Sequence, residues 1–267
     1  MKTLLSSRHI PLHTRFTMPE TMHSQPNFSH VSYASDYMEI AVQKVATHFD
    51  GDLAGKRVLD IPAGNGWVSE ELSKMGAEAV SADINEEKPH FSQVDMEKPL
   101  PFADNHFDAI VCCEGIEHVF SPFNLFAEFA RTLKDGGILV ITTPNVQNLY
   151  SRWQYLCTGY LFQFDPFNKI PLKDDVIGDK GHISPVSYGQ LRYYTEHFNM
   201  KTESPSGGRM KRTILLPLLL PFLLIGLWWN YRDWKRTSNR PERKEIISHL
   251  FNIRVLLSRS LVFVATR

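Results

Sequence analysis

Cysteine is scarce in this chain of 267 residues, and a net charge is absent. Of the three cysteines, Cys112 and Cys113 are adjacent, so the sequence offers neither a disulfide framework nor a CxxC metal pair. The 29 basic and 29 acidic residues balance, so no basic field points to a nucleic-acid partner. The first residues hold no sustained apolar run, so we expect no secretory signal there. These absences favour a globular protein with reduced thiols that faces the cytosol.

Internal repeats and low-complexity tracts are also absent, and the sequence shows a regular alternation instead. Short apolar bursts that suit buried strands occur at 56–64, 77–85, 107–115 and 136–145, with a weaker one at 90–97. Segments with helical spacing occur at 36–49, 67–76, 122–134 and 184–198. We expect Ser184 to cap the last of these helices. Strands that alternate with helices predict a parallel sheet covered on both faces.

Two further strands are predicted near the end of the chain, with a long apolar and basic segment between them. The stretch NMKTESPSG at 199–207 is the sixth strand, and RSLVFVATR at 259–267 is the last. The pattern therefore divides the chain into four parts: an N-terminal arm over 1–34, a core over 35–206, an insertion over 207–258 and a final core strand over 259–267.

A glycine turn follows the first predicted strand. Gly64 and Gly66 stand where that strand gives way to a helix, a place where glycine lets the backbone approach a ligand closely. Seventeen residues past Gly66, Asp83 ends the second strand, where a carboxylate can accept hydrogen bonds from both ribose hydroxyls. Dinucleotides and S-adenosylmethionine both use this arrangement. A dinucleotide site prefers a third glycine, at the position that Ser69 holds here.

The segments after the turn separate these two cofactors. Asp60, the glycine turn and Asp83, followed by VDMEKPLPFADNHFDAIVCCEGIEHV and LKDGGILVITTPN, resemble the class I S-adenosylmethionine-dependent methyltransferases. The resemblance covers roughly residues 55–145 in the right order and spacing. It implies an α/β fold: a Rossmann-like, seven-stranded, mostly parallel sheet with helices on both faces. Here the apolar insertion precedes the last strand.

The resemblance also implies a role for each matched position. Asp60 and the glycine turn would bind the methionine part of the cofactor, and Asp83 would bind its ribose. The residues after the second and third strands would bind its adenine. The implied cofactor-binding residues are Asp60, Pro62, Gly64, Asn65, Gly66, Asp83, Ile84, Asp95, Met96, Cys113 and Glu114. The family usually has glycine at position 62. Because proline has a fixed backbone angle, we expect a reshaped loop there.

The motif EGIEH at the end of the fourth strand supplies groups that can remove a proton from the methyl acceptor and so free its lone pair. Two carboxylates and an imidazole suit a divalent cation, which lowers the pKa of a bound hydroxyl. The sequence here resembles the ubiquinone-pathway O-methyltransferases and the small-RNA 2′-O-methyltransferases, which carry an E-x-x-E-H metal cluster. The implied ligands are Glu114, Glu117, His118 and His182, with Mg²⁺ as the expected cation. In the alternative, His118, His182 and Glu114 act in catalysis without a metal.

The insertion contains sixteen residues without a charge, Ile214–Trp229, flanked by basic residues on both sides. This is short of the ~20 residues that a spanning helix needs. A single crossing would also separate the last two strands, which pair with each other in this family. We therefore expect the segment to lie on or dip into the cytoplasmic face of a membrane, as a peripheral or monotopic anchor. The alternative is a buried helix in an enlarged core or a dimer interface.

Together these features predict an S-adenosylmethionine-dependent methyltransferase that methylates an oxygen of a membrane-resident or amphipathic acceptor. A prenylated quinone precursor and a lipid-linked glycan are acceptors of this kind. Two alternatives remain: a soluble small-molecule or glycan methyltransferase that dimerises through its apolar segment, and a membrane protein that binds the cofactor without catalysis.

Overall fold

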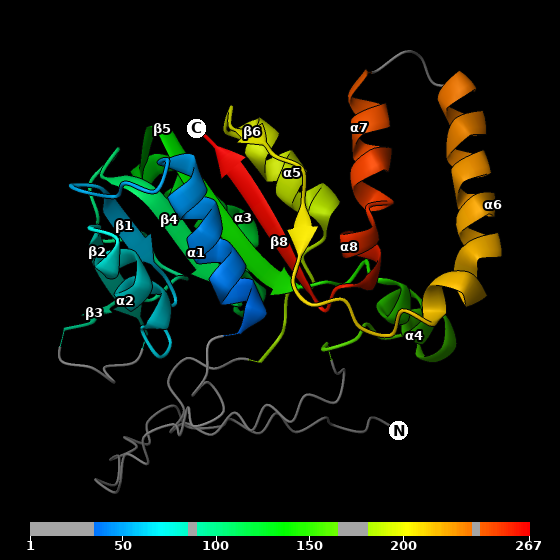
Figure 1. The fold of residues 1–267 in the computed structure, drawn as a ribbon, viewed down its shortest axis with the longest axis horizontal. Coiled ribbons are helices and arrows are strands. Elements are labelled where there is room, and N and C mark those ends of the chain that lie inside the picture. The colour runs from blue at the N-terminus through cyan, green and yellow to red at the C-terminus, as the bar shows by residue number, and fades with distance from the viewer. Residues whose placement is uncertain (1–34, 85–89, 165–180, 237–240) are drawn as a thin grey trace, which may run out of the picture.

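The computed structural model describes residues 35–84, 90–164, 181–236 and 241–267, so the arm predicted over 1–34 lies outside the described residues. One sheet with the order β3-β2-β1-β4-β5-β8-β6 forms its centre, and β7 pairs with β8 (Figure 1). The strands are β1 Arg57–Asp60, β2 Glu78–Asp83, β3 Ser92–Gln93, β4 Phe107–Cys113, β5 Leu133–Pro144, β6 Lys201–Thr202, β7 Ser206–Gly207 and β8 Ser260–Thr266.

The first five strands are parallel to one another, and β8 runs antiparallel to β5, β6 and β7. The prediction of a Rossmann-like, mostly parallel sheet is therefore confirmed. The prediction of seven strands is wrong, because the sheet has eight within the described residues. The expected sixth strand is divided into β6 and β7 at Pro205, and proline has no N–H to donate to the β8 ladder.

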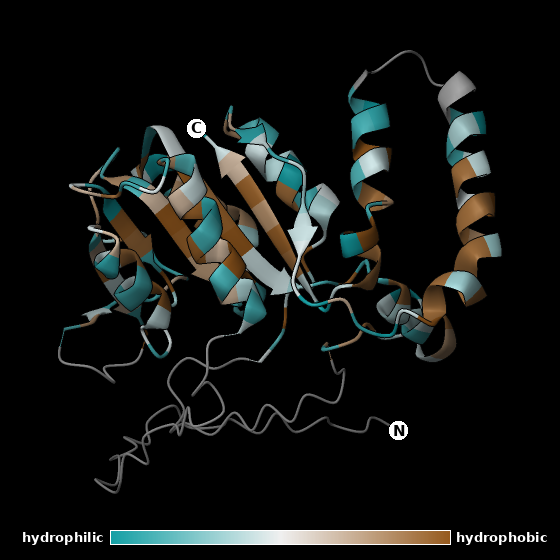
Figure 2. Ribbon diagram, in the orientation of Figure 1, coloured by the Kyte–Doolittle hydropathy of each residue, from teal (hydrophilic) through white to brown (hydrophobic). Residues whose placement is uncertain are grey.

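Helices cover both faces of the sheet, because the strand side chains alternate between two cores. Val58, Val140 and Val264 face the layer that contains α1 (Asp36–His48) and α2 (Trp67–Lys74). Leu59 and Phe263 face the layer of α3 (Pro122–Thr132) and α5 (Tyr188–His197). Figure 2 shows the middle of the central strands in brown, as expected for a sheet buried on both sides.

The predicted helices form, but the cap of α5 differs from the prediction. Ser187 is the N-cap, and it forms a reciprocal capping box with Gln190. The predicted cap, Ser184, instead donates its hydroxyl hydrogen to the carbonyl oxygen of Val119 at 2.6 Å. This bond ties the segment before α5 to the end of the short helix η2 (Ile116–His118).

The segment predicted as an insertion holds α6 Leu215–Arg236, α7 Pro241–Leu250 and α8 Ile253–Leu257. In Figure 1, α6 starts beside α4 (Leu149–Thr158), near the carboxyl end of β5, and runs toward the opposite edge of the sheet. There α7 returns antiparallel to it. Only the start of α6 therefore lies at the edge where the predicted cofactor residues gather.

A small apolar core holds this hairpin at its base. It consists of Leu149, Leu219, Leu223, Leu256 and Leu257, from α4, α6 and α8. The rest of α6 is largely unpacked: within the described residues, Leu215–Asp233 is long and apolar enough to cross a membrane by length and composition, and only 11% of that stretch is buried. The sequence count of sixteen apolar residues underestimated the helix, which extends over 22 residues.

Candidate active site at the carboxyl edge of the sheet

The turn after β1 is held by two carboxylates. Asp60 is fully buried at the end of β1, and its Oδ2 accepts hydrogen bonds from the Ser69 backbone N–H at 3.1 Å and from the Ser69 hydroxyl at 2.7 Å. Asp83, at the end of β2, accepts the Gly64 N–H at 2.9 Å. The Asn65 side chain accepts the Trp67 N–H at 3.0 Å. The turn therefore has a fixed shape before any ligand binds.

This turn leaves room where a cofactor would lie. Gly64 has a φ of +53°, and a Cβ added there would meet no atom within 4 Å. Gly66, with a φ of +79°, is the N-cap of α2, so the free N–H groups of that helix start at the turn. The second carboxylate oxygen of Asp60, Oδ1, is buried and has no hydrogen-bond partner among the described residues. An open cradle beside an unsatisfied buried carboxylate fits the cationic methionine part of S-adenosylmethionine.

Burial alters the acid-base behaviour of Asp60. Desolvation raises its pKa to about 7, and the negative charge of Asp83 adds to the rise. The two hydrogen bonds from Ser69 act in the opposite direction, because they stabilise the ionised form. A cation placed against Oδ1 would favour the ionised form further.

Five of the predicted cofactor residues line one cavity of about 50 Å³. They are Pro62, Asp83, Ile84, Asp95 and Met96. Apolar walls from Val94 and Val119 complete the cavity, and His118 borders it. The structure thus brings the residues assigned to ribose and adenine together next to a histidine assigned to catalysis. Their contacts with the cofactor remain predictions.

Pro62, at the position where the family usually has glycine, packs tightly in the turn. The Ile61–Pro62 peptide bond is cis, and the ring packs against Gly115 so closely that a Cβ on Gly115 would overlap it. The Ala63 N–H still reaches the Ala82 carbonyl at 2.8 Å, which keeps the turn attached to β2.

The end of β4 carries Cys113 and then Glu114, as predicted. Glu114 has a φ of +47°, unusual for a residue with a side chain and typical of functional sites. Its side chain is partly buried, and desolvation raises its pKa to about 7, against hydrogen bonds from Ser260 and Thr142 and the charge of Arg259. Its Oε1 has no partner among the described residues. Glu114 can therefore exchange a proton near neutral pH.

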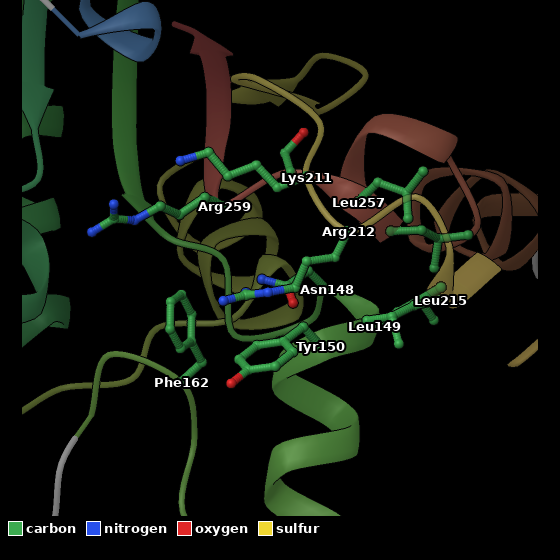
Figure 3. Close-up of a pocket in the computed structure, with 11 residues that line it drawn as sticks. Asn148, Leu149, Tyr150, Phe162, Lys211, Arg212, Leu215, Leu257 and Arg259 are labelled. Carbon is green, nitrogen blue, oxygen red and sulfur yellow. The ribbon is translucent and has the colours of Figure 1, made fainter. Parts of the chain in front are cut away.

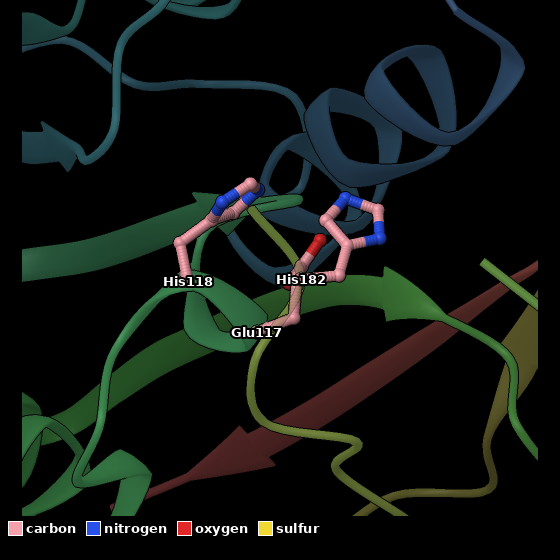
Figure 4. Close-up of side chains that lie close together, drawn as sticks. All are labelled: Glu117, His118 and His182. Atoms are coloured by element: carbon pink, nitrogen blue, oxygen red, sulfur yellow. The ribbon is translucent and has the colours of Figure 1, made fainter. Parts of the chain in front are cut away.

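Three of the four predicted metal ligands form a cluster. The ligand atoms of Glu117, His118 and His182 all lie within 4.8 Å of one another, and Figure 4 shows the Glu117 carboxylate beside the two imidazoles. The two rings stand 4.8 Å apart at 83°. Glu114 is not in this cluster, and its side chain hydrogen-bonds Ser260 and Thr142 instead, so its predicted role as a ligand stays a prediction.

The partners around this cluster suit a cation. His182 places its Nδ1 2.8 Å from the Gln163 carbonyl oxygen, which favours a proton on Nδ1 and a lone pair on Nε2. The Thr143 hydroxyl donates to Glu117 Oε2 at 3.1 Å, while Glu117 Oε1 is buried without a partner among the described residues. Burial raises the pKa of Glu117 well above its usual value, and Glu114 adds to this. A divalent cation would relieve both the unsatisfied oxygen and the desolvation.

Backbone pairing explains why residues so far apart in sequence meet. The N–H groups of Ile183 and Ser184 both donate to the Glu117 carbonyl oxygen at 3.0 Å. This holds the segment that contains His182 against η2, beside His118. The sequence indicated His182 only through the family pattern.

Sequence reasoning missed several polar residues at this site. Tyr37 on α1 lies in the field of Glu114 and Cys113, and burial raises its pKa to about 12, so its hydroxyl stays protonated near neutral pH. Arg259 and Ser260 reach Glu114 because β8 is antiparallel, which brings its first residues to the carboxyl edge. Thr142 lies at the carboxyl end of β5, where such residues are expected, so the carboxyl-end rule could have indicated it.

Comparison with known proteins places this site in a family. A model described as "Methyltransferase domain" matches residues 32–202. The ubiquinone biosynthesis O-methyltransferase of Dechloromonas aromatica is 32% identical over 107 residues, which cover 35% of this chain and 46% of that protein. The protein of the same name from Xanthomonas oryzae pv. oryzae is 35% identical over 108 residues, covering 35% of this chain and 45% of that protein. The chain thus spans about half the length of these relatives.

A solved structure shares the fold. The SAM-dependent methyltransferase from Archaeoglobus fulgidus superposes with a TM-score of 0.53 at 17% identity, over 86% of this chain and 94% of that one. S-adenosylmethionine is the cofactor of this family, and the open glycine cradle, the buried Asp60 and the cavity beside Asp83 fit it. The family model covers most of the chain, including the β1 turn, Asp83 and the end of β4. The chain therefore belongs to the methyltransferase domain family, as a class I S-adenosylmethionine-dependent methyltransferase.

Proposed function

We propose that this protein transfers the methyl group of S-adenosylmethionine to an oxygen of an amphipathic acceptor at the cytoplasmic face of a membrane. The observation that carries the proposal is the exposed apolar surface of α6. Leu218 and Phe222 are each 65% exposed, and Trp228 and Trp229 are each 57% exposed. The exposed set on α6 is Leu218, Leu220, Phe222, Leu224, Ile225, Leu227, Trp228, Trp229 and Tyr231.

A surface of this kind favours contact with lipid. Full burial of one large apolar side chain is worth roughly 1.5–3 kcal/mol, and micromolar affinity corresponds to about 8 kcal/mol. Insertion of the whole set is therefore sufficient for attachment, even though each side chain is only partly exposed. Trp228 and Trp229 both contact the Arg232 guanidinium, at 5.1 and 5.0 Å, an arrangement suited to the interface between lipid and water.

The return path of the chain supports attachment to one side of the membrane. α6 is long enough to cross, but α7 runs back beside it and contains Glu242, Arg243, Lys244 and Glu245. A second crossing through α7 would bury these charges in hydrocarbon at a high cost. Both ends of α6 also carry basic residues, which favour an anionic leaflet. We therefore infer a monotopic or peripheral attachment.

The chemistry needs a base or a cation near the transferring methyl. Methyl transfer from a sulfonium is an in-line displacement, so the protein's main task is to position the acceptor oxygen and remove its proton. Glu114, whose pKa is raised to about 7, can take that proton. Glu117, His118 and His182 would hold a divalent cation such as Mg²⁺, which would lower the pKa of a bound hydroxyl. The ubiquinone-pathway relatives make a phenolic quinone precursor the first acceptor to test.

The test is incubation of the full chain with methyl-labelled S-adenosylmethionine and a total lipid extract, followed by identification of the labelled species. We expect label in an amphipathic product, and none with the Asp83→Ala variant. Label only in water-soluble compounds would support the soluble alternative, in which α6 serves dimerisation. Cofactor binding without labelled product from any extract would support a non-catalytic role. Either result would contradict the proposal.

A further inference from the structure

A second cavity lies at the start of α6, at the edge of the sheet where the candidate active site is. It has a volume of about 100 Å³, several times the roughly 10–15 Å³ that one water needs. Lys211, Arg212 and Arg259 line it together with the aromatic rings of Tyr150 and Phe162. Figure 3 shows the three basic head groups on one side of the cavity and Leu149, Leu215 and Leu257 on the other. The cavity is thus cationic on one wall and apolar on the opposite wall.

Arg212 is held in place by an unusual local geometry. Its guanidinium lies 3.5 Å from the centre of the Tyr150 ring and 5.1 Å from that of Phe162. Its φ is +55°, a conformation that costs free energy for a residue with a side chain. The aromatic contacts fix the plane of the guanidinium and leave its N–H edge available, which prepares the group to bind an anion.

Within the described residues, salt bridges do not neutralise these three positive charges, although the charge of Arg259 also acts on the Glu114 carboxylate. Among the residues that the structure describes, no carboxylate forms an ion pair with Lys211, Arg212 or Arg259. Other partly exposed arginines behave differently: Arg131 pairs with Asp104 and Glu128. Three cations that converge without a salt-bridged carboxylate favour an external anion.

We propose that this cavity binds the phosphate or diphosphate group of the methyl acceptor. Leu215 of the apolar wall is the first residue of α6 and precedes the exposed Leu218 by one turn, so a lipid tail attached to the phosphate would lie along that helix. Arg259 directly precedes Ser260, whose side chain hydrogen-bonds Glu114 after the end of β4, and the charge of Arg259 also acts on that carboxylate. The group that accepts the methyl would therefore be close to the phosphate, on the head-group side. This inference rests on the proposed function, since it names the chemistry of its acceptor.

The test measures anion binding directly, with the full chain and without methyl transfer. Inorganic pyrophosphate is titrated by calorimetry into the wild type, the Arg212→Gln/Arg259→Gln double variant and Arg209→Gln. Arg209 is the matched control, because it loses the same charge nearby but does not line the cavity. We expect the double variant to bind pyrophosphate roughly tenfold or more weakly, the control to bind like the wild type, and Arg259→Lys to regain part of the affinity.

A second arm identifies the source of the phosphate. Flotation is compared for phosphatidylcholine vesicles with and without a polyprenyl phosphate. If polyprenyl phosphate increases flotation of the wild type but not of the double variant, the result supports a lipid-borne ligand. If the double variant loses only its pyrophosphate binding and flotation does not depend on polyprenyl phosphate, the result supports a soluble phosphorylated acceptor. Equal pyrophosphate affinity in wild type, double variant and control overturns the inference. S-adenosylmethionine affinity is measured alongside: if it is normal, the fold and the cofactor site are intact and only the cavity's role has failed.

Discussion

Ser69 donates two hydrogen bonds to the same oxygen of Asp60, one from its backbone N–H and one from its hydroxyl. Ser81 in turn donates its hydroxyl hydrogen to Ser69 Oγ at 2.8 Å, which orients this pair. Ser69 holds the position where a dinucleotide-binding turn has its third glycine. The residue that departs from the dinucleotide pattern therefore fixes the carboxylate assigned to the methionine part of S-adenosylmethionine.

The first prediction follows from the raised pKa of Asp60. Below about pH 7 the free protein keeps this carboxyl protonated, and a bound ammonium group favours the ionised form. Binding of S-adenosylmethionine should therefore release a proton, and affinity should fall by up to about tenfold for each pH unit below the Asp60 pKa. Calorimetry in buffers of different ionisation enthalpy measures the release. Asp60→Asn should bind weakly and without this pH dependence; an unchanged pH profile in that variant would exclude Asp60 as the source.

The second prediction concerns Asp83. It holds the Gly64 N–H at 2.9 Å and lines the cavity assigned to ribose and adenine. Asp83→Ala should remove these interactions and lower S-adenosylmethionine affinity by roughly a hundredfold or more, to the point where calorimetry detects no binding. Asp104→Ala, an exposed carboxylate paired with Arg131, is the matched control and should bind normally. Equal affinities in wild type and Asp83→Ala would mean that the cofactor lies elsewhere.

The sequence predicted the site best where a local apolar pattern marks the end of a buried strand. The strand ends that carry Asp60, Asp83 and Glu114 could be predicted because apolar bursts end there, and parallel strands bring their carboxyl ends to one edge. The glycine turn was predictable because strand, glycines and helix follow one another within a few residues. These features depend on local sequence, and the β-sheet order then follows from the family pattern.

What could not be predicted depends on long-range contacts. Arg259 and Ser260 reach Glu114 only because the last strand reverses direction. The cap of α5 moved from Ser184 to Ser187 because Ser184 instead bonds the carbonyl oxygen of Val119, 65 residues away in sequence. The length of α6 was underestimated because helix continues through polar residues past Trp229, which hydropathy alone does not register.

The third prediction tests the cation. If Glu117, His118 and His182 hold Mg²⁺, chelator treatment should abolish turnover, and added Mg²⁺ or Mn²⁺ should restore it in the wild type but not in His182→Ala. His197→Ala on α5 is the matched control, because this exposed histidine lies outside the cluster. Mn²⁺ binding followed by electron paramagnetic resonance gives a readout independent of activity. Turnover that survives the chelator would leave Glu114 and His118 to act without a metal.

The fourth prediction concerns α6 and the membrane. Ile225 and Trp228 are each 57% exposed, so Ile225→Glu/Trp228→Glu should leave the melting temperature nearly unchanged. The same change should sharply reduce flotation with vesicles that contain anionic phospholipid, because it places two carboxylates in the apolar surface and beside a negative leaflet. Met75→Glu is the control: Met75 is also exposed, and it follows α2, a helix at the far side of the sheet from α6 (Figure 1).

Activity measurements on the same variants distinguish an effect on membrane attachment from an effect on methyl transfer. The α6 double variant should retain S-adenosylmethionine affinity, because no residue of α6 lines the cavity beside Asp83. Its turnover on acceptor presented in vesicles should fall, while turnover on the same acceptor in detergent micelles should recover, since micelles remove the need to reach a bilayer. If the double variant floats and turns over like the wild type, α6 has another role. A wild-type dimer that becomes monomeric in the variant would then identify that role as self-association.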